Sequence, residues 1–175
     1  VTPSREAVMF PNGQSTKVAL RVRAGRDELK GEVSLPVPAG WKVEPAAVAV
    51  TLARGGDETT VEFAVTPPAG AKPSVTSPLF SADGRKWSYR EDRIDYTHIP
   101  FQLVLQPATM KLVPLALTLP QGAVGYIRGS GDSVADDLAH VGLHVEVLDD
   151  ESLRSGDLSR FAAIERRRAE QQRIA

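Results

Sequence analysis

The sequence predicts a mainly β protein, in which an antiparallel β-sandwich precedes a short, incomplete α/β segment. Several short runs before residue 107 alternate apolar with polar residues, and a period of two is typical of strands with one buried face. The chain also contains 13 prolines and 14 glycines, which favours many turns and therefore short strands. Strands of this length and spacing predict an Ig-like sandwich of two packed sheets. After residue 122 the pattern becomes strand, helix, strand and helix, which begins a parallel α/β unit.

Five alternating runs are the predicted strands of the sandwich. Run 16–24 is the clearest, because its apolar residues alternate with lysine and arginine. The others are 33–37, 48–52, 61–65 and 101–105. Because Pro36 and Pro38 lack an amide hydrogen, we expect 33–37 to lie at an edge of its sheet. In 101–105 we expect Phe101, Leu103 and Leu105 to be buried.

Aromatic residues stand at two places in the sequence, and at each they can be explained either by packing or by ligand binding. Trp41 follows a Pro-Ala-Gly turn and is interpreted as a core residue, with ligand stacking as the alternative. Residues 85–100 mix Trp87, Tyr89 and Tyr96 with charges of both signs. This segment is predicted to be an exposed hairpin whose rings pack on the sheet. The alternative is a carbohydrate platform, because sugar rings stack on aromatic side chains beside polar groups.

The α/β segment follows the turn at 120–122. Residues 123–127 and 143–148 are predicted strands, and apolar residues recur at helical spacing between them. An Asp-Ser pair at 132–133 can cap this helix through a side-chain oxygen, and Gly142 is expected to end it. A last, polar helix is predicted over 157–175. Two strands and one helix leave apolar faces uncovered, so we expect these faces to pack on the sandwich or on a partner chain.

Composition and charge limit the classes of function that the chain can have. The 175 residues are 42% hydrophobic and 25% charged, a soluble globular composition. The formal net charge of −1 supplies no overall positive field for nucleic acid. The absence of cysteine excludes disulfides and thiolate zinc sites. No apolar run approaches the ~20 residues of a membrane span, and the opening VTPSREAVMF does not have the pattern of a signal peptide.

The sequence contains no complete catalytic or metal-binding motif. His140 and His144 have the spacing of helical zinc ligands, but Gly142 is expected to end the helix between them, and there is no HExxH. A GxSxG nucleophile elbow is also missing. Neighbouring acids such as Asp136 and Asp137 diverge on a helix and make a poor acid–base pair. The sequence therefore predicts no metal and no cofactor.

The stretch GYIRGSGDSVADDL at 125–138 has two interpretations. Two glycines match the start of a G-x-G-x-x-G nucleotide fingerprint, but the third position is Val134. We interpret the stretch as a strand-to-helix turn. The alternative is an anion site formed by free amides at the helix start. Its residues would be Arg128, Gly129, Ser130 and Gly131.

Four segments carry a family resemblance. YTHIPFQLVLQPATMKLV (96–113), VGYIRGSGDSVADDLAHVGLHVEVLDDESL (124–153) and DLSRFAAI (157–164) resemble, in this order, the C-terminal region of large bacterial PIG-L (LmbE-like) deacetylases. LPVPAGWKVEP (35–45) is similar to an Ig-like accessory domain of the same proteins, which also accompanies sugar-binding modules in α-galactosidases. The resemblance implies a secreted or periplasmic protein.

The resemblance does not extend to the catalytic residues. The zinc motif of the family, of the type A-H-P-D-D, does not occur here, so no catalytic residue is carried over. The sequence also departs from the family where relatives continue into an apolar third strand, because RRRAEQ stands at 166–171.

These observations predict two regions, an Ig-like sandwich at 1–107 and a connecting strand with the partial α/β segment at 108–175. The expected function is a non-catalytic accessory role beside a sugar-amide deacetylase, in positioning or binding. The alternatives are a stand-alone carbohydrate-binding module and a nucleotide- or anion-binding fragment. The expected partners are a deacetylase domain, a second copy of the chain or a saccharide, without nucleic acid.

Overall fold

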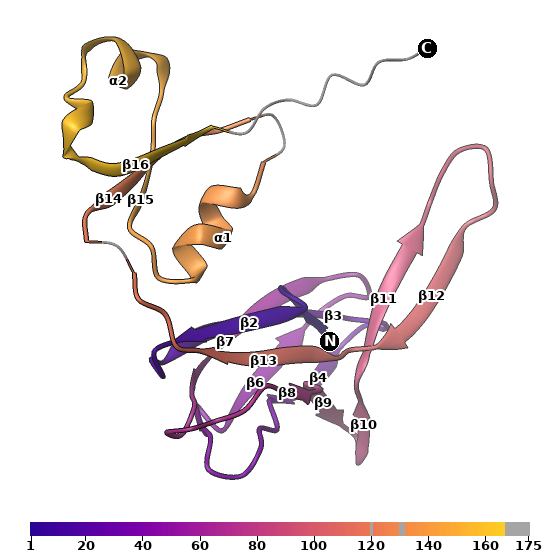
Figure 1. The fold of residues 1–175 in the computed structure, drawn as a ribbon. Coiled ribbons are helices and arrows are strands. Elements are labelled where there is room, and N and C mark those ends of the chain that lie inside the picture. The colour runs from indigo at the N-terminus through magenta and orange to yellow at the C-terminus, as the bar shows by residue number, and fades with distance from the viewer. Residues whose placement is uncertain (120, 130–131, 167–175) are drawn as a thin grey trace. The chain divides into compact units, whose positions relative to one another are not determined.

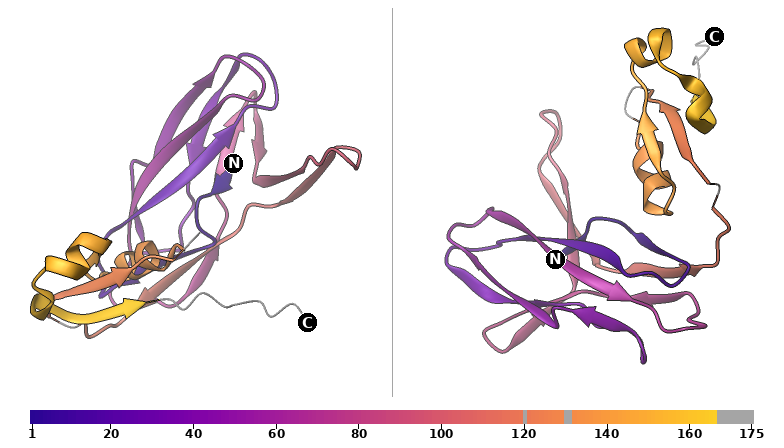
Figure 2. Two further views of the ribbon diagram at one scale, coloured as in Figure 1. Left: turned by 90° about the horizontal axis from the view of Figure 1, so that it is seen from above. Right: turned by 90° about the vertical axis from the view of Figure 1, so that its left-hand side faces the viewer.

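The computed structural model describes residues 1–119, 121–129 and 132–166, which belong to two compact units (Figures 1 and 2). Unit 1 is Val1–Ala116 and unit 2 is Leu117–Ala175. The division falls after Ala116 rather than after residue 107, because the strand that follows residue 107 pairs with two strands of unit 1.

Unit 1 contains the two sheets of a β-sandwich, and all strand pairs within them are antiparallel. The first sheet has the order β1-β3-β7-β5 and the second has the order β10-β9-β4-β6. In the first sheet the strands are β1 (Thr2–Pro3), β3 (Thr16–Arg23), β7 (Glu58–Thr66) and β5 (Lys42–Glu44). In the second sheet they are β10 (Arg85–Trp87), β9 (Leu79–Ala82), β4 (Leu29–Ser34) and β6 (Ala47–Leu52). The predicted mainly β class, with several antiparallel sheets, is confirmed.

Two smaller sheets complete unit 1. The sheet β2-β13-β8 comprises β2 (Ala7–Pro11), β13 (Met110–Leu115) and β8 (Ser74–Thr76), and β13 runs parallel to β2 and antiparallel to β8. The strands β11 (Tyr89–Ile94) and β12 (Gln102–Pro107) form a two-stranded sheet of their own. Figures 1 and 2 show this hairpin extending beyond the body of the sandwich.

The core of unit 1 is built from the alternate, inward-facing residues of its sheets. Leu20 of β3, Phe63 of β7 and Val33 of β4 are fully buried in one apolar cluster. The β2-β13-β8 sheet contributes Phe10 to the same cluster. The half-buried Trp41 packs against it, edge-on to the Phe10 ring, with the centroids 5.0 Å apart. The structure therefore places Trp41 at the core, as its packing interpretation expects.

The expectation for run 33–37 is wrong in one respect. Strand β4 ends at Ser34, before the prolines, and it pairs with β6 on one side and β9 on the other. It is therefore an interior strand of its sheet. The prolines that suggested an edge lie beyond the hydrogen-bonded part, where a missing amide hydrogen costs no ladder bond.

The expected burial of run 101–105 is also wrong. Phe101, Leu103 and Leu105 are exposed, with 60% of the Leu105 surface accessible. The physical reason is the pairing of β12 with β11 in a separate hairpin. Because this hairpin is not a layer of the sandwich, no other sheet of unit 1 covers its apolar residues.

Unit 2 contains a three-stranded parallel sheet with the order β15-β14-β16. Its strands are β14 (Ala123–Ile127), β15 (Val145–Val147) and β16 (Phe161–Arg166). The connections hold α1 (Val134–His140), α2 (Asp150–Ser155) and the 3₁₀ turn η1 (Leu158–Arg160). Asp149 caps α2 by accepting a hydrogen bond from the Ser152 amide at 2.8 Å, and its hydrogen bonds with Ser152 lower the pKa of this carboxyl.

The long helix predicted from residue 157 does not form over the described residues. Asp157 accepts a hydrogen bond from the Ser159 amide, but it caps only the 3₁₀ turn. Residues 161–166 then form β16, which pairs with the edge of β14. A third strand is thus present although RRRAEQ stands at 166–171. Pairing with β14 gives its backbone hydrogen-bond partners, whereas a short isolated polar helix is only marginally stable in water. The rest of the predicted helix, residues 167–175, lies outside the described residues.

Substitution of Gly31 tests the packing between β4 and β9. A Cβ on Gly31 would lie 2.5 Å from the Ser81 carbonyl oxygen and would also clash with the Phe80 ring. We expect Gly31→Ala to lower the free energy of unfolding of the sandwich by about 1–3 kcal/mol, the usual cost of overpacking.

Gly25→Ala is the matched control for chemical denaturation. No atom lies within 4 Å of a Cβ built on Gly25, so this variant should stay within about 1 kcal/mol of wild type. Equal midpoints for the two variants would contradict the close packing of Phe80 over Gly31.

Candidate functional site

The Trp87 cleft is the candidate site of unit 1. We use this name for two adjoining hollows, of about 640 and 440 Å³, that share Val1, Arg23 and Trp87 in their walls. The first continues over β9 and β10, and the second continues toward β11 and includes Tyr89. Volumes of this order are typical of small-molecule sites.

The two aromatic residues of the cleft are held differently. Trp87, on β10, packs on the buried Phe80 ring with the centroids 6.1 Å apart, and 37% of its surface stays exposed. Tyr89 begins β11 and is 52% exposed. Its carbonyl oxygen accepts a hydrogen bond from the Val1 amino group at 2.9 Å. The pKa of that amino group is lowered, because burial outweighs the opposing effect of the nearby Glu91 carboxylate. The cleft thus combines a rigid indole with a more accessible phenol.

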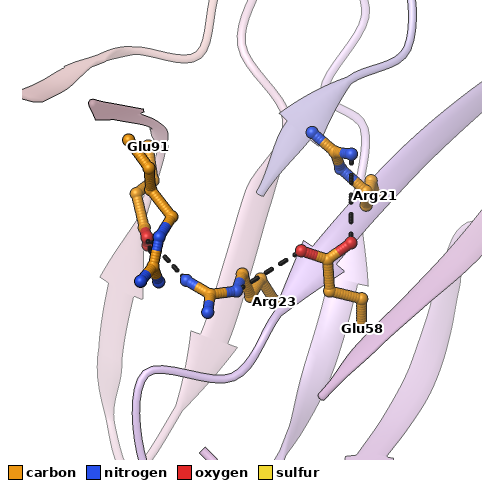
Figure 3. Close-up of polar contacts among 5 residues, drawn as sticks. Arg21, Arg23, Glu58 and Glu91 are labelled. Carbon is orange, nitrogen blue, oxygen red and sulfur yellow. Dashed lines mark hydrogen bonds and ion pairs between the residues drawn. The ribbon is translucent and has the colours of Figure 1, made fainter. Parts of the chain in front are cut away.

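An arginine–glutamate network lines the half of the cleft that continues toward β11, and Figure 3 shows its contacts. Arg23 contacts Glu58 at 3.3 Å through Nε and Glu91 at 2.6 Å through a terminal guanidinium nitrogen. Arg21 lies 3.9 Å from Glu58, and Arg93 lies 3.2 Å from Glu91. Each carboxylate is therefore shared by two guanidinium groups, and Arg23 links the sandwich to the hairpin.

The other half of the cleft carries two more arginines. Arg26 pairs with Asp83, and both side chains are mostly exposed. Arg85, on β10, is exposed and has no ion-pair partner among the described residues. Sequence reasoning missed these basic residues as site candidates. The basic face of run 16–24 was visible in the sequence, but its meeting with residues 83–93 depends on the fold.

The structure does not bring Tyr96 to this cleft. Tyr96 lies in the turn beyond β11, stacked on His98 with ring centroids 5.8 Å apart. Five residue steps along β11 separate Tyr89 from Ile94, which corresponds to roughly 17 Å of extended strand. The three aromatics singled out from the sequence therefore divide into a pair at the cleft and one residue at the hairpin tip.

The glycine-rich stretch of unit 2 is organised around the buried Asp132. One carboxylate oxygen accepts hydrogen bonds from the Gly129 amide, at 3.2 Å, and from the Tyr126 hydroxyl. The other oxygen accepts from the Val134 amide at 2.8 Å. Arg128 forms an ion pair with Asp136 at 3.5 Å. Two of the predicted anion-binding residues, Ser130 and Gly131, lie outside the described residues.

These contacts bear on the anion-site alternative. The Gly129 amide, which that alternative needs to be free, already donates to the Asp132 carboxylate. The helix that follows has only seven residues, so its N-terminus offers a weak field. The geometry gives the strand-to-helix turn a clear physical cause, a buried carboxylate that gathers local donors.

The described residues contain neither a metal-binding cluster nor a helix that could span a membrane. Among the described residues, no group of three or more histidine, aspartate or glutamate side chains is placed to hold a metal ion. Within the same residues, no helix is long and apolar enough to cross a membrane.

The sandwich is the part of the chain that matches a known protein family. Residues 10–77, which lie in the sandwich, match the family described as "NPCBM-associated, NEW3 domain of alpha-galactosidase". No curated protein matches the chain. Among solved structures, the chain is similar to SSP-19, an MSP-domain protein like family member of Caenorhabditis elegans. That likeness has 15% identity and a TM-score of 0.35, and it covers 66% of this chain and all of the other.

Substitution of Asp132 tests the turn of unit 2. Asp132→Ala leaves the buried Tyr126 hydroxyl without this acceptor and releases two amides, so we expect a loss of about 1–3 kcal/mol in the stability of unit 2. Ser133→Ala is the control, because Ser133 makes no side-chain cap bond and its hydroxyl contacts only the exposed Asp137. Hydrogen exchange of the unit 2 amides measures both, and equal protection would contradict the role of Asp132.

Proposed function

We propose that this chain is a non-catalytic accessory module of a carbohydrate-active enzyme. The observation that carries the proposal is the match of residues 10–77 to a NEW3 domain, a type of module described by its association with α-galactosidase. The match covers the strands that hold most of the sandwich core. An accessory module needs a stable scaffold and an outward surface, and the sandwich core and the exposed hairpin of unit 1 are consistent with both.

The hairpin supplies a surface suited to such a role. Tyr96, Phe101, Leu103 and Leu105 are large apolar residues, each about half exposed or more, and they lie on or beside the same two strands. Contiguous apolar surface of this kind marks interaction sites in soluble proteins. In the proposal, the hairpin face contacts the catalytic domain that the module accompanies.

We further propose that this enzyme is a sugar-amide deacetylase. The support is the sequence resemblance of residues 96–113, 124–153 and 157–164 to PIG-L (LmbE-like) deacetylases. The first of these segments contains the apolar hairpin strand β12 and the other two lie in unit 2. The resemblance also supports a secreted or periplasmic location.

Activity measurements test the accessory role. The purified chain should release neither acetate from N-acetylglucosamine oligomers nor galactose from α-galactosides. Antibodies against the chain should isolate from its source cells a larger protein or complex that does release acetate, and zinc chelation should abolish this release. Hydrolysis of either substrate by the purified chain, at a specific activity that further purification does not change, would contradict the accessory role. Isolation of an α-galactosidase by the antibodies, instead of an enzyme that releases acetate, would contradict only the deacetylase assignment.

A second candidate function is saccharide binding by the chain itself. The observation that favours it is the Trp87 cleft, in which a fixed indole and Tyr89 stand beside several hydrogen-bonding side chains. Aromatic faces with neighbouring polar groups are suited to the apolar face and the hydroxyls of a sugar ring. The two functions are compatible, because an accessory module can hold substrate near its enzyme.

Aromatic substitutions test saccharide binding. We expect Trp87→Ala and Tyr89→Ala each to weaken binding to a polysaccharide by about 1–2 kcal/mol, a factor of roughly 5–30. Tyr96→Ala is the matched control and should bind as wild type, because it lies at the far end of the hairpin. Affinity electrophoresis measures binding, and thermal denaturation checks that the loss of the Phe80–Trp87 contact has not unfolded the chain. Equal effects of the Tyr96 and Trp87 variants would place binding elsewhere.

A further inference from the structure

We propose that the Trp87 cleft selects saccharides that carry carboxylate or sulfate groups. This inference rests on the saccharide-binding role proposed above and names its ligand class. It depends on three features of the cleft: an excess of guanidinium groups, one arginine without an ion-pair partner in the described part of the chain, and the presence of Trp87 in the walls of both hollows.

The walls of the cleft carry more positive than negative charge. Five arginines line the two hollows, against three carboxylates, which leaves two positive charges in excess. The arginines are Arg21, Arg23, Arg26, Arg85 and Arg93, and the carboxylates are Glu58, Asp83 and Glu91. The whole chain has a formal net charge of −1, so this excess is local. A concave surface with a net excess of one sign of charge attracts ligands of the other sign.

The ion pairs within the cleft leave guanidinium donors for a ligand. Glu58 and Glu91 each serve two arginines, and a guanidinium group has five N–H donors. Arg21 and Arg93 are about half exposed and each has one carboxylate contact. Arg85 has none among the residues that the structure describes. Guanidinium groups bind carboxylates and sulfates through paired, charge-assisted hydrogen bonds.

Trp87 lies where a sugar ring stacked on it could reach arginines of both hollows. It lines both hollows, with Arg85 two residues earlier on the same strand and Arg23 in the shared wall. Alternate residues of a strand point to the same face, so Arg85 and Trp87 share the side of β10 that lines the cleft. A ring stacked on the indole would therefore present its acidic substituent to Arg85 or to the Arg23 network.

Binding of matched acidic and neutral sugars tests the charge preference. The probes are an oligogalacturonate, its methyl ester, a chondroitin sulfate oligomer and, as an anion without a sugar, polyglutamate, each titrated calorimetrically into the full chain. We expect the free acid or the sulfated oligomer to bind at least about fivefold more tightly than the methyl ester, with affinity falling as NaCl rises from about 0.01 to 1 M. The acid and the sulfated oligomer, compared with each other, identify which anionic group the cleft prefers.

Two variants separate the charge from the aromatic contact. Arg85→Gln should weaken binding of the acidic sugar at least about threefold and leave the methyl ester within about twofold, whereas Trp87→Ala should weaken both. Lys86→Gln is the matched control, because it removes the same charge from the neighbouring residue of β10, which points to the opposite face. It should bind the acidic sugar as wild type.

Three outcomes would overturn the inference in different ways. Equal affinity for the acid, the sulfated oligomer and the ester would remove the charge preference but leave saccharide binding intact. Equal affinity for polyglutamate and for the acidic sugar would show charge attraction without sugar recognition. No binding of any sugar by a folded chain would overturn both this inference and the saccharide-binding function, while the accessory role would still be tested by the activity measurements.

Discussion

The alternate burial of apolar side chains on β3, β4 and β7 is the constraint on which the rest of unit 1 depends. Leu20, Phe63 and Val33 point into one core, and residues of a strand alternate between its faces. The same register that buries them turns Arg21 outward and pairs Arg23 with Glu58 across β3 and β7. A slip of one residue would exchange the faces. The charged wall of the Trp87 cleft is therefore a consequence of how the core packs.

The hairpin is joined to this scaffold by polar contacts. Arg23 reaches Glu91 on β11, and the Val1 amino group donates a hydrogen bond to the Tyr89 carbonyl oxygen. Trp87, on the neighbouring strand β10, packs on Phe80, whose ring belongs to the core. Partly exposed ion pairs are generally worth no more than about 1 kcal/mol. The ion pairs of the cleft are therefore expected to contribute little to the stability of unit 1.

Unit 2 contains a buried carboxylate, Asp132, between β14 and α1. Asp132 accepts hydrogen bonds from the Tyr126 hydroxyl and from the Gly129 and Val134 amides. A buried carboxylate that gathers nearby donors in this way supports the interpretation of the stretch as a strand-to-helix turn.

The sequence by itself determined the mainly β class, the strands β3, β6 and β7, and the position of β14, because period-two burial and turn residues are local signals. It also pointed to Trp87 and Tyr89 through their mixture with charged residues. Only the tertiary structure decided that β12 pairs with β11 outside the sandwich, that residues 161–166 form a strand, and that Arg23 joins Glu58 to Glu91. Each of these depends on which strand edge or side chain is available from a distant part of the chain, and an alternating pattern carries no information about the identity of its partner.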